Sequence, residues 1–225
     1  TRAGAGILTE EGANQFVLDM ISQRVLKFGP FTLKSGRQSP YFFNLGAIDH
    51  GDGLRRLGSA YAERLRFLEY DFDVIFGPAY KGIPIAVSTS IAMAENDQPV
   101  GVAYNRKEPK GHGEGGVLVG TPLAKRRVVI VDDVLTAGTA VVESARLVRE
   151  AGGDLVGILV ALDRQEYVEE GSLTALESIS RELSVPVESI AGLNDVLRCI
   201  KSNPEYRHTL AELTQYQQAH CQVLE

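Results

Sequence analysis

Hydrophobic residues along the chain follow two periods, one typical of buried strands and one typical of amphipathic helices. Short apolar runs, often β-branched, predict strands at 73–76, 99–104, 128–131, 155–162 and 187–190. Segments of helical spacing separate most of these runs, so strands and helices alternate along the chain. This alternation predicts an α/β fold with a mainly parallel central sheet and helices on both of its faces.

Helices are predicted where apolar residues recur every three or four positions. The first carries Val17, Ile21 and Val25 on one face and has Thr9 as its candidate N-cap. The others cover, in order, the face of Leu54, Leu57, Tyr61 and Leu65, then residues 83–95 and 139–151. A glycine pair ends the last of these, and the chain beyond about 171 is predicted to be mostly helical.

The segment FTLKSGRQSPYFFN, residues 31–44, predicts a strand, a turn and a second strand. Ser35 and Gly36 supply the turn signal, and Pro40, which has no amide proton, indicates a strand at a sheet edge. Consecutive strand residues face opposite sides. We therefore expect at most one of Phe42 and Phe43 to face a pocket and the other to belong to the core.

Composition places the chain among globular proteins and opposes several functions. Of 225 residues, 44% are hydrophobic and 23% charged, which suits one large domain with a sizeable core. No apolar run is long enough to cross a bilayer, and the net charge of −6 opposes non-specific binding to nucleic acid or membranes. No secretory signal is recognised, and Cys199 and Cys221 lack metal-ligand spacing, so we expect free thiols in a reducing cytoplasm.

Three unusual segments fall where predicted strands end. They are GPAYKG at 77–82, NRKEPKGHGEGG at 105–116 and DDVLTAGT at 132–139. In open α/β sheets, ligands bind beyond the carboxyl ends of the parallel strands. The coincidence predicts one ligand site at this edge of the sheet.

The run VVIVDDVLTAGTA, residues 128–140, carries the most specific chemistry. Its small-residue turn opens a helix, so backbone amides and threonine hydroxyls there can cradle a phosphate. It contains neither the GxGxxG nor the Walker pattern. Asp132 and Asp133, just ahead of the turn, can accept hydrogen bonds from sugar hydroxyls or bind Mg²⁺. Together these features predict a ribose 5-phosphate site; the alternative is a pair of N-cap aspartates before an ordinary helix.

The 105–116 loop adds local positive charge to an acidic protein. Five of its twelve residues are Gly or Pro, and the segment contains no hydrophobic side chain such as Val, Leu or Phe. Arg106, Lys107, Lys110 and His112 are its potential cations, and they suit a loop that closes over a diphosphate. His112 can act there as a hydrogen-bond donor without serving as an acid.

VVIVDDVLTAGTA resembles the binding motif for phosphoribosyl diphosphate (PRPP) in type I phosphoribosyltransferases, a motif that does not select the acceptor base. Four further segments together resemble the orotate phosphoribosyltransferases in their bacterial and fungal form: LKFGPFTLKSGRQSPYFFN, FGPAYKGIPIA, NRKEPKGHGEGG and LDRQE. The similarity spans about residues 17–170 with the segments in the expected order. It implies the type I phosphoribosyltransferase fold with a small N-terminal hood.

The resemblance also implies a role for each matching residue. The implied PRPP-binding residues are Lys34, Tyr80, Lys81, Arg106, Lys107, Lys110, His112, Asp132, Asp133, Val134, Leu135, Thr136, Ala137, Gly138, Thr139 and Ala140. The implied orotate-binding residues are Lys34, Phe42, Phe43, Thr136 and Arg164. The residues expected to act in catalysis are Lys81, Arg106, Lys107, Lys110, His112, Asp132 and Asp133.

The implied reaction converts orotate and PRPP into orotidine 5′-monophosphate and diphosphate in UMP biosynthesis, with Mg²⁺ as cofactor. The diphosphate and ribose hydroxyls of PRPP would mainly hold the ion, with Asp132 and Asp133 as further candidate ligands. In the family the enzyme is a homodimer whose loop acts largely across the interface. We expect a single domain with a hood at about 1–50, a PRPP-binding core at 70–165 and a mostly helical region at 171–225.

Three other functions compete with this interpretation. A phosphoribosyltransferase for a purine or another pyrimidine would carry the same PRPP motif, although TLKSGR, FFN and DRQE argue against it. A PRPP-sensing regulator that binds nucleic acid would need a basic face or an added DNA-binding module, which the net charge of −6 opposes. A non-enzymatic metal protein is less well supported, because only one paired acidic site is evident.

Overall fold

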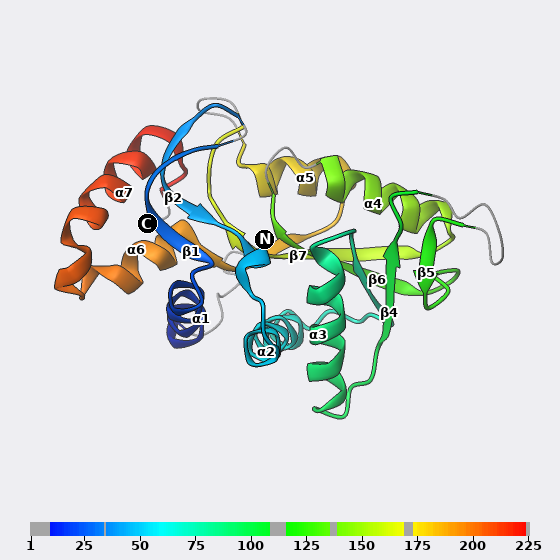
Figure 1. Ribbon diagram of the computed structural model, residues 1–225. Helices are drawn as coiled ribbons and strands as arrows, with labels where there is room; N and C mark the ends of the chain where they lie inside the picture. Colours follow the sequence, from blue (N-terminus) through cyan, green and yellow to red (C-terminus); the bar gives the residue numbers. More distant parts are fainter. Residues whose placement is uncertain (1–9, 34, 109–115, 136–138, 169–172, 224–225) are drawn as a thin grey trace.

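The computed structural model describes residues 10–33, 35–108, 116–135, 139–168 and 173–223. Its centre is a six-stranded sheet with the strand order β5-β4-β3-β6-β7-β8 (Figure 1). The strands are β3 (Val74–Gly77), β4 (Gly101–Asn105), β5 (Leu118–Gly120), β6 (Arg127–Val134), β7 (Asp154–Asp163) and β8 (Val187–Gly192). All neighbouring pairs are parallel except β4 with β5. The predicted α/β fold with a mainly parallel sheet is confirmed.

Two strands of the main sheet differ from the prediction by more than two residues. β6 continues to Val134, so Asp132 and Asp133 lie inside the strand, and Asp132 pairs with Val160 of β7. The prediction ends this strand at Val131 because carboxylates are depleted in strands. β5 is missing from the prediction because three residues are too few to show a period.

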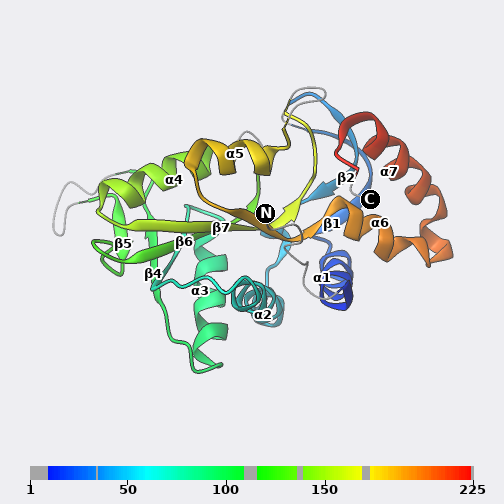
Figure 2. The ribbon, with the colours of Figure 1, turned by 180° about the vertical axis from the view of Figure 1, so that it is seen from behind.

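Helices cover both faces of the sheet (Figures 1 and 2). On one face lie α2 (Gly51–Phe67) and α3 (Gly82–Ala94), and on the other lie α4 (Thr139–Glu150) and α5 (Ala175–Leu183). None of the helices in the described ranges has the length and apolarity needed to cross a membrane.

Strand β6 contributes to a separate apolar core on each face. Val129 and Val131 belong to the core that includes α2 and α3, whereas Val128 and Ile130 belong to the core that includes α4 and α5. All four side chains are fully buried. A strand covered on both faces is apolar at consecutive positions, which explains the unbroken VVIV run.

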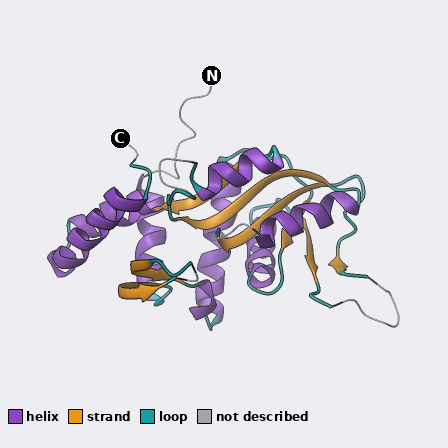
Figure 3. Ribbon diagram, turned by 90° about the horizontal axis from the view of Figure 1, so that it is seen from above, coloured by secondary structure: helices purple, strands orange, loops and turns teal. Residues whose placement is uncertain are grey.

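A hairpin stands beside the main sheet as a small sheet of its own (Figure 3). It consists of β1 (Leu26–Thr32) and β2 (Gln38–Phe43), which pair antiparallel. The predicted order of strand, turn and strand is confirmed, but the first strand begins at Leu26, before the predicted segment. The remaining elements are α1 (Glu10–Ser22), α6 (Leu193–Lys201), α7 (Arg207–His220) and the short 3-10 turns η1 (Leu45–Ala47) and η2 (Pro204–Tyr206). α1 packs on α6, and α7 packs on β2 at the outer side of the hairpin (Figure 1).

The first helix is shorter than predicted. It ends at Ser22, and Arg24 takes a left-handed backbone conformation with φ of 58°. Val25 is fully buried, but it lies in the connection to β1 and not on the helix face that carries Val17. Thr9, the candidate N-cap, lies outside the described residues.

Helices α2 and α3 approach each other closely at Gly58. A Cβ atom added to Gly58 would overlap the backbone carbonyl of Ser88 in α3. Glycine in a helix interior is about 1 kcal/mol less favourable than alanine. The close contact between the two helices explains why glycine occupies this position.

Gly58→Ala is expected to destabilise the protein by about 1–3 kcal/mol, because the overlap with Ser88 outweighs the better helix propensity of alanine. Urea unfolding followed by circular dichroism measures this difference in the free energy of unfolding. Gly51→Ala, at the start of the same helix, is the control, because an added Cβ there meets no atom within 4 Å. A Gly58→Ala variant as stable as the wild type would contradict the close contact.

Candidate active site

The paired carboxylates of β6 lie at the carboxyl end of the sheet and are nearly enclosed by protein. Asp132 is 9% exposed and Asp133 is 7% exposed. Each accepts a hydrogen bond from the next backbone amide: Asp132 Oδ1 from Asp133 N at 2.9 Å, and Asp133 Oδ1 from Val134 N at 2.8 Å. These local bonds fix both carboxylates against the strand backbone.

The two carboxylates project to opposite sides of the sheet. Because side chains alternate along a strand, Asp133 shares its side with Val129 and Val131, toward α2 and α3. Asp132 shares its side with Ile130, toward α4. The pleat of the strand therefore separates two like charges that are adjacent in the sequence.

Lys81, which directly precedes α3, neutralises one member of the pair. Its Nζ lies 2.6 Å from Asp133 Oδ2, and about half of the lysine side chain stays exposed (51%). Asp132 is compensated less well. Burial, followed by the negative charge of Asp133, raises the pKa of Asp132 to about 7, and Lys81 offsets this only in part. Asp132 is therefore an acceptor whose charge needs further donors.

Tyr61 of α2 supports β6 beneath the carboxylates. Its hydroxyl donates to the backbone carbonyl of Asp132 at 2.7 Å, and its side chain is fully buried. Burial, together with the charges of Asp133 and Asp132, raises the pKa of this phenol well above its ordinary value, so it remains a donor. The sequence pattern places Tyr61 only on an apolar helix face. The only sign in the sequence that Tyr61 also forms a hydrogen bond is its hydroxyl group, which needs a partner when it is buried.

The turn between β3 and α3 brings Tyr80 and Lys81 to the same edge of the sheet. The amide of Ala79 donates to Asn105 Oδ1 at 2.9 Å, which fastens the turn to the end of β4. The peptide bond between Ala79 and Tyr80 is cis. Lys107 Nζ lies 4.8 Å from the ring centroid of the exposed Tyr80, within reach of a cation–π contact. Asn105 is thus a supporting residue: it lies in the predicted loop segment but is not among the predicted site residues.

The ends of the 105–116 loop are held together by hydrogen bonds. The amide of Arg106 donates to the carbonyl of Val117 at 2.7 Å, and Arg106 Nη1 donates to the carbonyl of Gly116 at 3.4 Å. Arg106 and Lys107 therefore emerge from the sheet next to the Tyr80 turn. The other predicted loop cations, Lys110 and His112, lie outside the described residues.

The predicted phosphate turn is described only at its two ends. Leu135 is buried in the core beneath α4, so only its backbone can serve a ligand, and Val134 is the last residue of β6. Ala140 is exposed in the first turn of α4, and the side chain of Thr139 is not described. The remaining residues predicted to bind PRPP or orotate fall outside the described ranges: Lys34, Thr136, Ala137 and Gly138.

Two of the predicted orotate residues lie at the end of the hairpin strand β2. Phe43 is buried in the core, whereas Phe42 is 39% exposed and stacks on Phe31 with ring centroids 5.4 Å apart. The strand alternation predicted from the sequence is confirmed. Phe42 is the ring that remains accessible to a ligand.

Arg164, which follows β7, is held by neighbouring side chains. Its Nε and Nη2 both bond to Glu166 Oε1, at 2.8 Å and 2.7 Å, and Nη2 also donates to Ser39 Oγ at 3.0 Å. The guanidinium carbon lies 4.1 Å from the ring centroid of Tyr41. Glu166 occupies the Nε–Nη2 edge, so a ligand carboxylate would meet the Nη1 side of the guanidinium.

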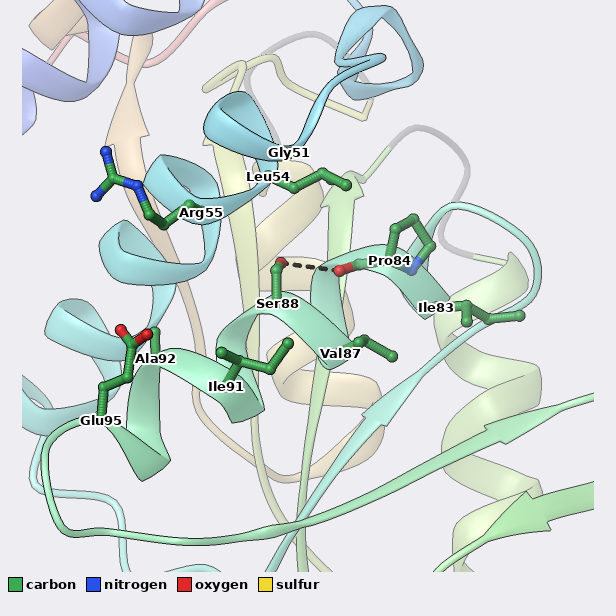
Figure 4. Close-up of a pocket in the computed structure, with 10 residues that line it drawn as sticks. All are labelled: Gly51, Leu54, Arg55, Ile83, Pro84, Val87, Ser88, Ile91, Ala92 and Glu95. Carbon is green, nitrogen blue, oxygen red and sulfur yellow. Dashed lines mark hydrogen bonds between the residues drawn. The ribbon is translucent and has the colours of Figure 1, made fainter.

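An apolar hollow of about 440 Å³ lies between α2 and α3 and shares no residue with the carboxylate site (Figure 4). Its apolar lining includes Leu54 of α2 and Ile83, Val87 and Ile91 of α3. Val87 and Ile91 are 41% and 57% exposed. An open apolar hollow suits a protein surface better than it suits an anionic nucleotide.

The carboxylate pair by itself supplies too few side chains for a complete metal site. Among the residues that the structure describes, no group of three His, Cys, Asp or Glu side chains is placed to hold a metal ion. Mg²⁺ is usually bound through one or two carboxylates together with substrate phosphates. Asp132 or Asp133 can therefore contribute to an ion that takes its other ligands from a bound anion.

The chain is similar to known proteins in sequence and in fold. The model of the phosphoribosyl transferase domain family matches residues 46–192. An orotate phosphoribosyltransferase of Nitrosococcus oceani is 47% identical over 204 residues, which cover 90% of this chain and 92% of that protein. One of Marinobacter nauticus is 50% identical over 192 residues, covering 85% and 90%. The crystal structure of orotate phosphoribosyltransferase from Francisella tularensis has a TM-score of 0.82 at 34% identity and covers 92% of this chain and 100% of that one.

Asp132→Asn is expected to stabilise the protein at and above neutral pH. Its pKa rises from about 4 in the unfolded chain to about 7 in the folded one, so the charged carboxyl lowers stability as pH rises through that interval. An amide does not titrate there, and its oxygen can still accept the bond from Asp133 N. Urea unfolding between pH 4 and 8 should show an advantage that grows up to pH 7 and then levels off, at a few kcal/mol or less.

Asp52→Asn is the control of opposite sign. A hydrogen bond from Arg55 lowers the pKa of this exposed carboxylate, so its replacement should remove a little stability above the unfolded pKa. A difference between Asp132→Asn and wild type that does not change with pH would contradict the raised pKa of Asp132.

Proposed function

The chain belongs to the phosphoribosyltransferase family and, within it, to the orotate phosphoribosyltransferases, and on this premise we propose that it transfers the phosphoribosyl group of PRPP to orotate. The products are orotidine 5′-monophosphate and diphosphate, in the biosynthesis of pyrimidine nucleotides. The observation that carries the proposal is the buried pair Asp132 and Asp133 at the carboxyl end of β6, shortly before α4 begins. Two acceptors for sugar hydroxyls thus stand beside a helix N-terminus that favours phosphate.

In the proposed complex, Asp132 and Asp133 accept hydrogen bonds from the two ribose hydroxyls. Hydroxyl donors would stabilise the charged form of Asp132, which burial disfavours. The 5-phosphate is assigned to the segment ahead of α4. The diphosphate lies at the edge formed by Tyr80, Lys81, Arg106 and Lys107. Lys110 and His112 are proposed as further cations for the diphosphate.

Orotate occupies the space between the hairpin and the end of β7. Phe42 offers an exposed ring, and Arg164 offers the Nη1 side of its guanidinium to the orotate carboxylate. β6 and β7 are neighbours, with Val134 paired to Leu162, so Arg164 follows the strand next to the carboxylate pair. Lys34, Thr136 and the backbone around Phe43 complete the proposed orotate site.

The reaction breaks the bond between ribose C1 and a diphosphate oxygen and forms the bond between C1 and a ring nitrogen of orotate. Positive charge develops on the ribose, as in glycoside hydrolysis, and negative charge gathers on the leaving diphosphate. Lys81 and Lys107 supply positive charge near that leaving group. No covalent nucleophile is required, because orotate attacks and PRPP carries the leaving group. The protein aligns the two substrates and excludes water.

We assign Mg²⁺ as the cofactor. Asp132 or Asp133 would contribute to holding it, and oxygens of PRPP would supply the remaining ligands. When bound, the ion offsets the negative charge of the departing diphosphate.

The active protein is proposed to be a homodimer with shared active sites. The hollow between α2 and α3 offers exposed Val87 and Ile91 to a second subunit (Figure 4). Homodimer interfaces are richer in apolar surface than ordinary protein surfaces. Lys81 directly precedes α3, so an interface on this helix would lie next to the diphosphate end of the site.

The same proposal extends to the organisation and location of the chain. One catalytic domain would combine the hood at about 1–50, the PRPP-binding core at 70–165 and the C-terminal region at 171–225. Cys199 and Cys221 are free thiols, which supports a reducing cytoplasmic environment.

Wild-type protein is expected to consume orotate when PRPP and Mg²⁺ are supplied, followed as the loss of orotate absorbance. Uracil, adenine and hypoxanthine, offered in parallel, are expected to yield no nucleotide, and EDTA is expected to abolish turnover. The double variant Asp132→Asn/Asp133→Asn should lose about 10²-fold or more of kcat while circular dichroism shows an intact fold. Turnover of another base instead of orotate would replace the proposed substrate, and full turnover in EDTA would remove Mg²⁺ from the proposal.

Ile91→Arg is expected to convert the dimer to a monomer, because it places an unpaired charge in an apolar interface. Analytical ultracentrifugation measures the molecular mass in solution. Leu18→Arg on α1 is the matched control, because Leu18 is 50% exposed on another helix. An Ile91→Arg variant that stays dimeric would exclude this face as the interface.

A further inference from the structure

Glu166 lies at the centre of a polar cluster at the proposed orotate end. Its Oε1 accepts hydrogen bonds from Arg164 and, at 2.6 Å, from the hydroxyl of Tyr216. Its Oε2 lies 3.1 Å from Arg37 Nη1. The Glu166 side chain is 17% exposed and Arg164 is 9% exposed. One carboxylate thus serves two guanidinium groups and a phenol.

The members of this cluster come from distant parts of the chain. Arg37 belongs to the turn of the hairpin, Arg164 and Glu166 follow β7, and Tyr216 belongs to α7. In Figures 1 and 2 the yellow segment after β7 rises beside the blue hairpin, with the red helix α7 close by. The C-terminal helix therefore reaches the segment that carries the predicted orotate arginine.

Backbone hydrogen bonds tie the same segments together. The amide of Tyr167 donates to the carbonyl of His220 at 3.1 Å, and the amide of Gln222 donates to the carbonyl of Gln165 at 2.8 Å. Gln165 itself has a left-handed backbone with φ of 56° and is buried. The residues that end α7 and follow it thus define the path of the chain next to Arg164.

The charges of the cluster suit recognition of an anion. Two guanidinium groups share the Glu166 carboxylate, so Arg37, Arg164 and Glu166 together carry a net charge of one positive unit. A buried guanidinium requires a partner, and an arginine held in one orientation loses less entropy when it binds a planar carboxylate. The Tyr41 ring beneath Arg164 and the single oxygen Oε1 at its Nε–Nη2 edge define that orientation.

We propose that Glu166 is a positioning residue, which holds Arg164 with its Nη1 side toward the substrate carboxylate, and that Tyr216 of α7 fixes Glu166 in turn. The inference rests on the proposed function and deepens it. It gives the C-terminal helix a part in substrate recognition, although α7 carries none of the predicted substrate-binding residues.

Tyr216→Phe tests the proposal without changing any charge. The variant loses the hydrogen bond to Glu166 and also the longer bond, at 3.5 Å, that the hydroxyl accepts from Arg164 Nη2. The KM for orotate should therefore rise about three- to tenfold, while kcat and the KM for PRPP stay within about twofold. Tyr206→Phe is the matched control, because Tyr206 also lies in the C-terminal region but packs its ring on Phe28. The control is expected to leave both KM values unchanged.

Glu166→Gln separates positioning from charge. The amide oxygen of glutamine accepts more weakly from a guanidinium than a carboxylate does, so if Glu166 positions Arg164 the variant should raise the KM for orotate by about three- to tenfold and leave the KM for PRPP near the wild-type value. If the carboxylate acted only through its charge, its removal would instead lower the KM for orotate, because a negative charge near the substrate carboxylate would be gone. A lower or unchanged KM for orotate would therefore overturn the inference.

Thermal unfolding of each variant shows whether it is folded. If Glu166→Gln does not fold, the orotate KM of Tyr216→Phe decides the test. Equal increases in both KM values would indicate general damage to the site and would overturn the inference. Wild-type protein without orotate turnover would overturn the proposed function and the inference together. Wild-type turnover combined with an unchanged orotate KM in Tyr216→Phe would overturn the inference alone.

Discussion

The structure around the active site depends on placing two adjacent carboxylates at the buried end of one strand. Burial and mutual repulsion both oppose ionisation of such a pair. The strand resolves part of this conflict through its pleat, which sends Asp133 toward α3 and Asp132 toward α4. Lys81 then pairs with Asp133, and the Tyr61 hydroxyl holds the carbonyl of Asp132. The positions of α2 and of the β3–α3 turn are therefore coupled to the charges of β6.

The two halves of the proposed substrate site follow from the neighbouring positions of β6 and β7. The PRPP half grows from the end of β6 and the orotate half from the end of β7, and the parallel register brings these ends to the same edge. Beyond β7, however, the chain leaves the sheet, and a polar cluster replaces the sheet as its support. Glu166 and α7 provide that support, which gives α7 a reason to pack against β2 of the hairpin.

Features encoded by neighbouring residues could be predicted from the sequence, whereas contacts between distant residues could not. The VVIV run, the glycine-rich loop and the hairpin turn each carry a local signal, and the α/β fold follows from their order. The Lys81–Asp133 pair joins residues 52 positions apart, and the Arg164–Ser39 bond joins residues 125 apart. No periodicity encodes such contacts. The end of β6 was placed too early because strand propensity disfavours aspartate, whereas here the site requires it.

The acidic pair lowers the stability of the free protein and favours the binding of groups that can replace its present partners. A carboxyl with a pKa near 7 is held in a place where its charge costs folding energy. Lys81 is already engaged with Asp133, so it can meet a diphosphate fully only if ribose hydroxyls or a metal ion take over part of its task. Binding of the sugar and binding of the diphosphate would then support each other through Asp133 and Lys81. Such coupling favours the complete PRPP molecule over either of its parts, because each part alone would leave one of the two charges less well satisfied.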